Sequence, residues 1–233
     1  MALAEHINDR VRQSYVETGT NQTAVRTVSQ YLTSAVTVTD GSLALGGPSD
    51  ELSTEGLKSA TIQINWTVQA ASAKSFVDGD VTVGSDSVGE TAHGYLTGLE
   101  GQLTTTGTLP GGLATATNYY IIRVDADSYK FATSRANAEA GTAVDITSAG
   151  GGGTHTFTPT AGGAVGEFVV QSTVYDLVDD NWGTITLSTA ITVNNASDSA
   201  IIDLTSLPGD YIRIGYNVTS GQGTYTAKIK GRG

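Results

Sequence analysis

The chain has 233 residues, and its 23 acidic side chains outnumber its 12 basic ones, which gives a formal net charge of -11. Such a charge repels polyanions over most of the surface, so the composition disfavours a nucleic-acid-binding protein. The chain contains no cysteine, which excludes both a disulfide framework and a thiolate metal site. No window approaches the roughly 20 apolar residues of a membrane span, and no membrane partner is expected. The 29 glycines and the many Thr/Ser stretches indicate short strands and tight turns, so we predict an all-β fold.

The first 25 residues are compatible with two periodicities. Leu3, Ile7, Val11 and Tyr15 recur every four positions, as on one face of a helix, whereas Val11, Gln13 and Tyr15 also fit the alternation of a strand. The turn-forming residues that follow, around Gly19, suit a strand that ends near residue 18. We therefore expect residues 1–25 to form an N-terminal arm and a first strand.

Residues 26–84 alternate with a period of two. Val36 and Val38 form one alternating set, and Ile62, Ile64 and Trp66 form another. Turn clusters at 40–41 and 46–50 interrupt these runs at the spacing expected of a sandwich. Because Trp66 alternates in phase with the two isoleucines, we expect its indole to lie in the core rather than at a binding surface.

Residues 85–160 differ in texture, with Gly/Thr-rich turns around a dense pair of strands. The runs at 119–124 and 129–132 flank the acidic turn 125–127 and predict a hairpin. A second strand pair is predicted at 144–147 and 155–158, joined by the glycine-rich segment 148–154, which we expect to be too flexible to hold a rigid site by itself. His155 alternates with Phe157, so its side chain is expected to pair across a sheet or to line a turn.

Residues 161–233 contain five β-prone runs separated by Asp/Asn/Gly/Pro turns, as in antiparallel β proteins. In the last run the side chains of Tyr225, Ala227 and Ile229 should face one way and Lys228 and Lys230 the other. We interpret this run as a solvated edge strand whose lysines discourage aggregation. The alternative is that Lys228, Lys230 and Arg232 form a local cationic site for an acidic neighbour or a phosphate.

Residues 26–84 and 161–233 share a pattern of alternating β-prone runs separated by turn residues, and residues 85–160 lack this pattern. The fold predicted is therefore an antiparallel β-sandwich of jelly-roll or immunoglobulin-like type, built from 26–84 plus 161–233 and interrupted by an inserted small β domain at 85–160. Three tandem units are the alternative, but residues 26–84 are marginal in length and apolar content for a core of their own.

The inventory of chemically active residues is thin. His6, His93 and His155 are isolated and lie in no metal-ligand spacing. Pairs of acidic residues, such as Asp125 and Asp127, could bind calcium, but turn carboxylates more often cap local backbone amides. The glycine-rich segments fit no phosphate-binding pattern, and no GxSxG elbow is present. We expect no enzyme, no catalytic residue, no metal site and no cofactor.

The middle of the chain resembles a small β module that recurs in bacteriophage tail, baseplate and other virion proteins. The resemblance covers residues 103–158 and rests on four features in order: the turn TTTGTLPGGL, the strand TNYYII, the strand DSYKFATS and the pair DIT and GTHT. The ending DYIRIGYNVTSGQGTYTAKIK resembles the last hairpin of phage sandwich domains, and the opening DRVRQSYVETGT is more weakly similar to a first strand of such proteins. No lytic or depolymerase motif accompanies them.

This resemblance implies a structural virion protein, made in the host cytoplasm and present in many copies in the particle. The position expected is capsid decoration or a tail, neck or baseplate accessory, and the partners expected are other virion proteins and copies of the chain itself as a homo-oligomer. The alternative is a host-surface or carbohydrate-binding module in which aromatic rings stack on sugars. The candidate surface contacts for these roles are Trp182, Tyr119, Tyr120, Lys228, Lys230 and Arg232.

Overall fold

The computed structural model describes residues 36–45, 47–48, 52–54, 57–173, 182–187, 189–207, 209 and 211–232. The predicted N-terminal arm and first strand, residues 1–25, lie outside these ranges. The regular structure that is described is almost entirely antiparallel strand, which confirms the all-β prediction. Within the described ranges, helical structure is limited to α2 (Arg135–Glu139) and two short 3-10 turns, η1 (Asp78–Asp80) and η2 (Val83–Ser85).

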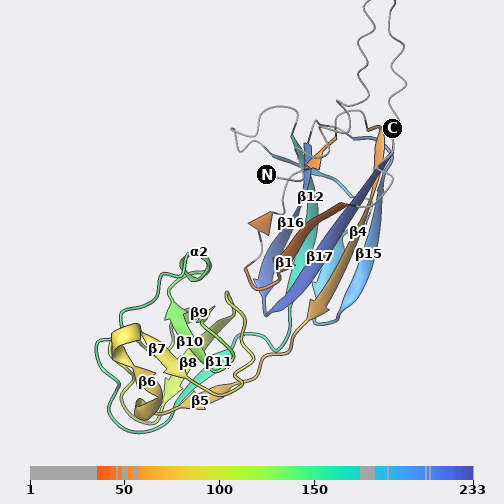
Figure 1. Ribbon diagram of the computed structural model, residues 1–233. Helices are drawn as coiled ribbons and strands as arrows, with labels where there is room; N and C mark the ends of the chain where they lie inside the picture. The colour runs from red at the N-terminus through yellow and green to blue at the C-terminus, as the bar shows by residue number, and fades with distance from the viewer. Residues whose placement is uncertain are drawn as a thin grey trace, which may run out of the picture.

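Two sheets pack face to face as a β-sandwich at one end of the molecule (Figure 1). The four-stranded sheet has the order β1 (Val36–Ser42), β17 (Gly223–Arg232), β4 (Ser59–Val68) and β15 (Asp198–Leu204). The six-stranded sheet has the order β13 (Gly183–Ile185), β12 (Val165–Thr173), β16 (Tyr211–Ser220) and β2 (Gly47–Pro48), with β14 (Ile191–Asn194) beside β12 and β3 (Leu52–Ser53) beside β16.

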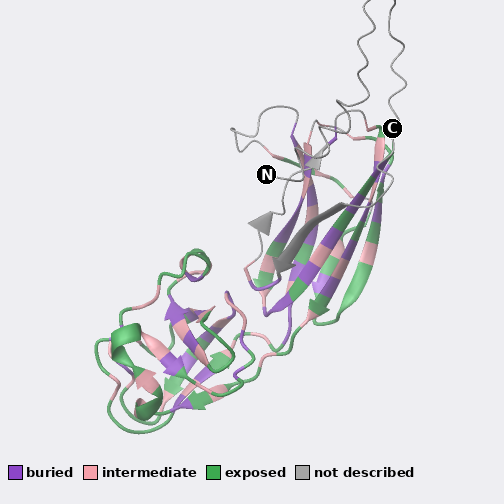
Figure 2. Cartoon of the chain, in the orientation of Figure 1, coloured by how far each residue is buried: buried purple, intermediate pink, exposed green. Residues whose placement is uncertain are grey.

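The sandwich core follows from the alternation of the long strands. Ile62, Ile64 and Trp66 on β4 are buried together, as their spacing predicts, and they face β12 and β16. The Trp66 ring lies 5.5 Å from that of Phe168 on β12, and its indole nitrogen donates to the Ala196 carbonyl at 2.8 Å. Burial of these alternate side chains, drawn purple in Figure 2, is the main stabilising contribution to this part of the molecule.

The last strand is not the edge strand that the lysines suggested. β17 lies between β1 and β4, and it pairs with β4 along its whole length and with β1 over residues 224–229. Its alternation is as predicted, because Tyr225, Ala227 and Ile229 are buried whereas Lys228 and Lys230 are exposed. A period of two shows which face of a strand is exposed to solvent, but the strands beside it come from distant parts of the sequence. The lysines therefore mark the outer face of β17 and do not show that it lies at the edge of the sheet.

A third sheet, of seven strands, forms the inserted module, here defined as residues 74–159. Its order is β5 (Lys74–Phe76), β11 (His155–Pro159), β8 (Glu100–Thr105), β9 (Asn118–Arg123), β10 (Ser128–Ala132), β7 (Ser87–Gly89) and β6 (Val81–Thr82). Its core is separate from that of the sandwich and is rich in aromatic rings: Phe76, Tyr95, Tyr119, Tyr129, Phe131 and Phe157.

Two predictions for this region need correction. The module begins at β5, so residues 74–84, assigned above to the sandwich, belong to the seven-stranded sheet. These strands are too short to show alternation, and texture alone placed the boundary too late. The β9–β10 hairpin is confirmed. The second predicted pair is wrong, because residues 144–147 form no strand and β11 pairs instead with β5 and β8.

Candidate functional site

The most concentrated polar chemistry in the described part of the chain is a buried chain of hydrogen bonds centred on His155. This side chain is fully buried, its Nε2 lies 2.9 Å from Asp78 Oδ1, and its Nδ1 lies 2.8 Å from Thr105 Oγ1. Thr105 Oγ1 also accepts a hydrogen bond from the Gly107 amide at 3.0 Å. In the tautomer that carries its proton on Nε2, the ring donates to the Asp78 carboxylate and accepts a hydrogen bond from the Thr105 hydroxyl at Nδ1.

The electrostatics of this cluster favour an ionised Asp78. The hydrogen bond from His155, followed by that from the Gly152 amide, lowers the pKa of the Asp78 carboxyl below its ordinary value of 3.8. The set of a carboxylate, a histidine and a hydroxyl matches the components of a nucleophilic triad. The His155 ring is fully buried, and its two nitrogens lie within hydrogen-bond distance of Asp78 and Thr105.

The function of the cluster in the fold is to fasten the glycine-rich segment. Asp78 Oδ2 accepts from the Gly152 amide at 2.7 Å, and Thr108 and Gly151 exchange backbone hydrogen bonds in an isolated bridge. A Cβ added at Gly107 would collide with the Gly152 carbonyl, so the two segments approach as closely as glycine permits. The glycine-rich segment 148–154, predicted to be flexible, is therefore held by hydrogen bonds to Asp78 and to the backbone of Thr108.

A second buried histidine performs a similar local role. His93 Nδ1 accepts from the Tyr95 amide at 2.9 Å, and its Nε2 lies 3.0 Å from the Asp125 carbonyl. Its ring packs against those of Tyr95 and Tyr129. Burial raises the pKa of both tyrosines. His6, the third histidine of the sequence, lies outside the described residues.

The acidic turn pairs cap backbone amides in the described part of the chain. Asp125 Oδ1 accepts from the Asp127 amide at 2.8 Å, and this hydrogen bond is the main cause of a lowered pKa at Asp125. Asp127 in turn accepts from the Ala92 amide, and Asp80 from the Val77 amide. No group of three or more His, Cys, Asp or Glu side chains that could hold a metal ion occurs among the described residues.

The candidate aromatic contacts of the sequence are only partly at the surface. Tyr119 is 4% exposed and its hydroxyl accepts from the Ala114 amide, so it is a core residue of the module and not a contact residue. Tyr120 is half-buried, and the Arg135 guanidinium lies over its ring at 5.3 Å. Trp182 is half-buried, with the guanidinium of Arg213 at 4.2 Å from its ring centre.

The three cationic candidates lie together on the outer face of the four-stranded sheet. Lys228, Lys230 and Arg232 alternate along β17 and are all exposed. Successive members of such a row are about 7 Å apart, because each strand residue advances about 3.4 Å. Their neighbours across the sheet, Gln63 and Thr61 on β4, are uncharged. The structure thus keeps these three residues as a row of positive charge and separates them from the three aromatic candidates.

Sequence reasoning missed the joint between the sandwich and the module. The side chain of Gln222, in the turn between β16 and β17, is fully buried. Its Nε2 donates to the Gly94 carbonyl at 2.9 Å, and its Oε1 accepts from the Leu96 amide at 2.7 Å. Arg135 of α2 adds a second bridge, since its Nε donates to the Ala44 carbonyl at 2.8 Å. No local pattern marks a glutamine that bridges segments so far apart in the chain.

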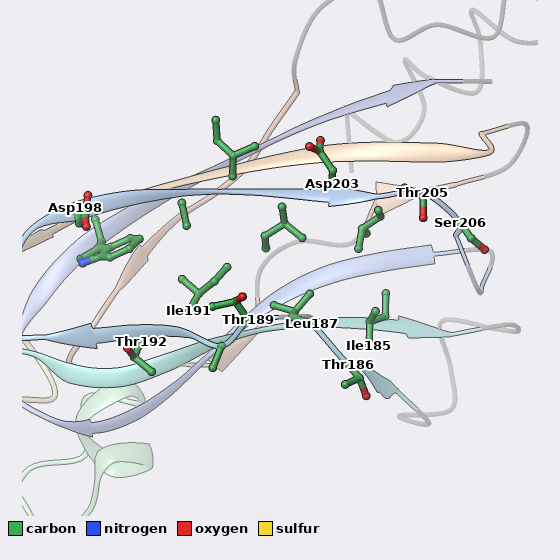
Figure 3. A pocket seen from close by; sticks show the side chains of 16 residues that line it. Ile185, Thr186, Leu187, Thr189, Ile191, Thr192, Asp198, Asp203, Thr205 and Ser206 are labelled. Carbon is green, nitrogen blue, oxygen red and sulfur yellow. The ribbon is translucent and has the colours of Figure 1, made fainter.

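A groove along the open side of the sandwich was also not predicted. It runs between β15 of one sheet and the β13–β14 segment of the other, and it has a volume of about 730 Å³ (Figure 3). Figure 3 shows Asp198, Asp203 and Thr205 along one wall and Ile185, Leu187 and Ile191 along the other. The apolar lining is the inner face of the sandwich, which no described strand covers at this side.

The comparisons with known proteins add no assignment. No protein-family model matches the chain, and no curated protein matches its sequence. Among the described residues, no helix has the length and apolar character needed to cross a membrane.

Proposed function

We propose that this chain is a structural component of a bacteriophage virion, either a capsid decoration protein or a tail, neck or baseplate accessory. It acts through self-association and surface contacts and not through catalysis. The observation that carries the proposal is that the stretch resembling phage particle modules, residues 103–158, lies within one folded unit, the module of residues 74–159. It supplies β9, β10, parts of β8 and β11, and most of the aromatic core of the seven-stranded sheet.

Two further features support this role. Three of the buried polar residues of the described chain, His155, His93 and Gln222, make internal hydrogen bonds that fasten loops and the joint. In Figure 1 the module extends from one end of the sandwich, which gives an elongated molecule with several separate faces. Weak contacts on such faces become strong when a particle holds many copies in fixed geometry.

The test is the presence of the protein in purified particles. Phage particles purified by density gradient are digested for mass spectrometry, and an antibody against the full-length chain locates it by electron microscopy. We expect a constant number of copies per particle at a symmetric position. Absence of the chain from infectious particles would refute the proposal.

A second candidate function is recognition of a host-surface glycan, and the setting of Trp182 favours it. The Arg213 guanidinium that lies over this indole also donates from Nε to Gln171 Oε1 at 2.8 Å, so an aromatic ring and polar side chains meet on one outer face. Such combinations bind sugars by stacking and hydrogen bonding. On a glycan array, Trp182→Ala should lose binding, and Val124→Ala, at an exposed turn of the module, should keep it. Equal binding by both variants would remove Trp182 from consideration.

A further inference from the structure

The free edge of the four-stranded sheet lies beside the groove and has few of the features that protect edge strands. β15 pairs with β4 along its whole length without a bulge, and no described strand pairs with its other side. In an antiparallel strand, alternate residues direct their N–H and C=O groups away from the existing partner, so this edge presents unpaired backbone groups. Its sequence, DSAIIDL, contains neither lysine nor proline, the residues that commonly block such edges.

The two carboxylates of β15 are already engaged. Asp203 accepts from the Thr61 hydroxyl on β4 at 2.7 Å, so its charge is held toward the paired side of the strand. Asp198 accepts from the adjacent Ser199 amide at 2.8 Å. Neither acidic side chain therefore protects the free edge in the way that a protruding charge would.

The centre of β15 carries the most exposed large apolar side chain that the structure describes. Ile201 is 68% exposed, compared with 52% for Val124, the next highest value. It is the fourth of the seven residues of the strand and points to the outer face, opposite Gln63 of β4. An exposed isoleucine at the middle of an open edge is the central anchor that a strand-to-strand contact needs.

We propose that β15 pairs antiparallel with β15 of a second copy across a two-fold axis that passes through Ile201. This register places the two isoleucines opposite each other, Ala200 opposite Ile202 of the second copy, and Ser199 opposite Asp203 of the second copy. The contact is self-complementary, as a two-fold interface must be. The two four-stranded sheets then form one continuous sheet across the axis.

Charge is compatible with this register although each copy carries a net charge of -11. In this register Asp203 lies opposite the uncharged Ser199 of the second copy, and Asp198 lies opposite the uncharged Leu204. The two Asp203 residues lie four positions apart along the paired strands, about 14 Å, which exceeds the Debye length of about 8 Å at physiological salt. The repulsion that remains is between whole molecules, so salt should strengthen the association.

The groove is the reason for choosing a second copy of this strand over an unrelated peptide. Ala200, Ile202 and Leu204 point inward and line one wall of the groove. Pairing at the two-fold axis brings the same three inward side chains of the second copy alongside them. The apolar wall is thus extended from both sides with residues of matching spacing. This inference deepens the proposed function. It rests on that function in one respect, namely that a particle holds many copies of the chain close together.

Cysteine substitution tests the register, because the full-length chain contains no cysteine of its own. Under mild oxidation we expect Ile201→Cys to form a covalent dimer that a reductant reverses, since residues directly opposite each other have the Cα spacing that a disulfide requires. Ser199→Cys is the matched control, and it should form about tenfold less dimer, because the two Ser199 positions lie about 14 Å apart. Equal yields from both variants, or no dimer from Ile201→Cys, would overturn the proposal.

Light scattering over a range of protein and salt concentrations tests the association itself. The wild-type chain and Val124→Asp should approach the mass of two chains, and more readily at 0.5 than at about 0.1 M salt, whereas Ile201→Asp should weaken dimerisation about 100-fold. Dimerisation that Ile201→Asp leaves unchanged would overturn the inference. Crosslinks that join β15 to residues 1–35, and not to β15 of the second copy, would also overturn it. Its failure is separable from that of the proposed function, because presence of the chain in purified particles is measured independently.

Discussion

The sandwich and the inserted module are stabilised in different ways. The central strands of the sandwich, β4, β12, β16 and β17, have nine or ten residues each, and their alternate side chains form one continuous core. The module strands have two to six residues, and their small core of aromatic rings is surrounded by loops. Long strands are held in place by the many backbone hydrogen bonds along their length, whereas short strands need additional contacts to fix the loops between them.

Those additional contacts are buried polar side chains. His155, His93 and Gln222 each bond to a loop or to the backbone of a segment distant in sequence, and all three are at most 3% exposed. Buried hydrogen bonds of this kind stabilise modestly when made and destabilise more strongly when one partner is removed. The module should therefore be more sensitive than the sandwich to the loss of single polar side chains, and the two should respond separately to damage in their cores.

The largest effect is expected from emptying each core in turn. Phe131 contacts the rings of Phe76, Tyr119, Tyr129 and Phe157, so Phe131→Ala should destabilise the module by about 3 to 5 kcal/mol. In hydrogen exchange with mass spectrometry, protection should fall in residues 74–159 and persist in β12, β16 and β17. The matched variant is Phe168→Ala, which should give the converse pattern. Loss of protection throughout the chain in both variants would show that the two cores unfold as one unit.

The sequence predicted most where the physical signal is local. Burial of Ile62, Ile64 and Trp66 and exposure of Lys228 and Lys230 both follow from the period of two, which is a property of each strand by itself. The central position of β17 could not be derived, because its neighbours β1 and β4 come from far earlier in the chain.

The candidate site was less accessible to sequence reasoning. His155 and Asp78 are 77 positions apart, and no motif joins them. The alternation of His155 with Phe157 predicts that this side chain pairs across a sheet or lines a turn, but no local pattern identifies Asp78 and Thr105 as its partners. Tyr119 and Tyr120 are equivalent candidates for surface contact in the sequence, and only the pleat of β9 separates the buried ring of Tyr119 from the half-buried ring of Tyr120.

The second-largest effect should come from the His155 cluster. His155→Phe keeps a ring beside Phe76 but leaves Thr105 and Asp78 without their shared partner. We expect the module to lose about 2 kcal/mol and the glycine-rich segment 148–154 to exchange amide hydrogens faster. The control is Thr156→Val on the opposite face of the same strand, where only a surface hydroxyl contact is lost. A module as stable as the wild type would mean that the cluster does not hold the segment.

The same cluster predicts a dependence of stability on pH. Because the pKa of Asp78 is lower in the folded chain than its ordinary value of 3.8, its ionisation favours folding above that value, and this contribution is lost as pH falls through the folded pKa. The melting temperature of the module, measured by calorimetry, should therefore drop as pH falls from about 4 through the lowered pKa of Asp78 in the folded chain. Asp78→Asn should show a smaller drop. An identical pH profile in the two proteins would contradict the assignment, since Asp125, whose pKa is also lowered, contributes equally to both.

A smaller effect is expected at the joint. Gln222→Met keeps the length of the side chain and removes its hydrogen bonds to Gly94 and Leu96, at a cost of about 1 to 2 kcal/mol. Both cores should remain folded, but small-angle X-ray scattering should report a wider range of orientations between sandwich and module. Gln69→Met is the control, because Gln69 is exposed and makes a single side-chain hydrogen bond to the same Gly94 carbonyl. Unchanged scattering of Gln222→Met would mean that other contacts, such as those of Arg135 and Gln69, fix the orientation.

The smallest effects on stability are expected from removing single buried tyrosine hydroxyls, and each of the two cores contains one that can be tested. Tyr129 in the module and Tyr216 in the sandwich have buried hydroxyls without a hydrogen-bond partner among the described residues, and burial raises the pKa of Tyr216 to about 12. Replacement of either by Phe removes an unpaired polar group, so chemical denaturation should show stability unchanged or higher by up to about 1 kcal/mol. Tyr95→Phe is the contrast, because the Tyr95 hydroxyl donates to the Ser72 carbonyl at 2.9 Å, and its loss should cost about 1 kcal/mol. A gain at Tyr216 with a loss at Tyr129 would mean that the module hydroxyl has a partner such as water, and that polar contacts support the module more widely than the sandwich.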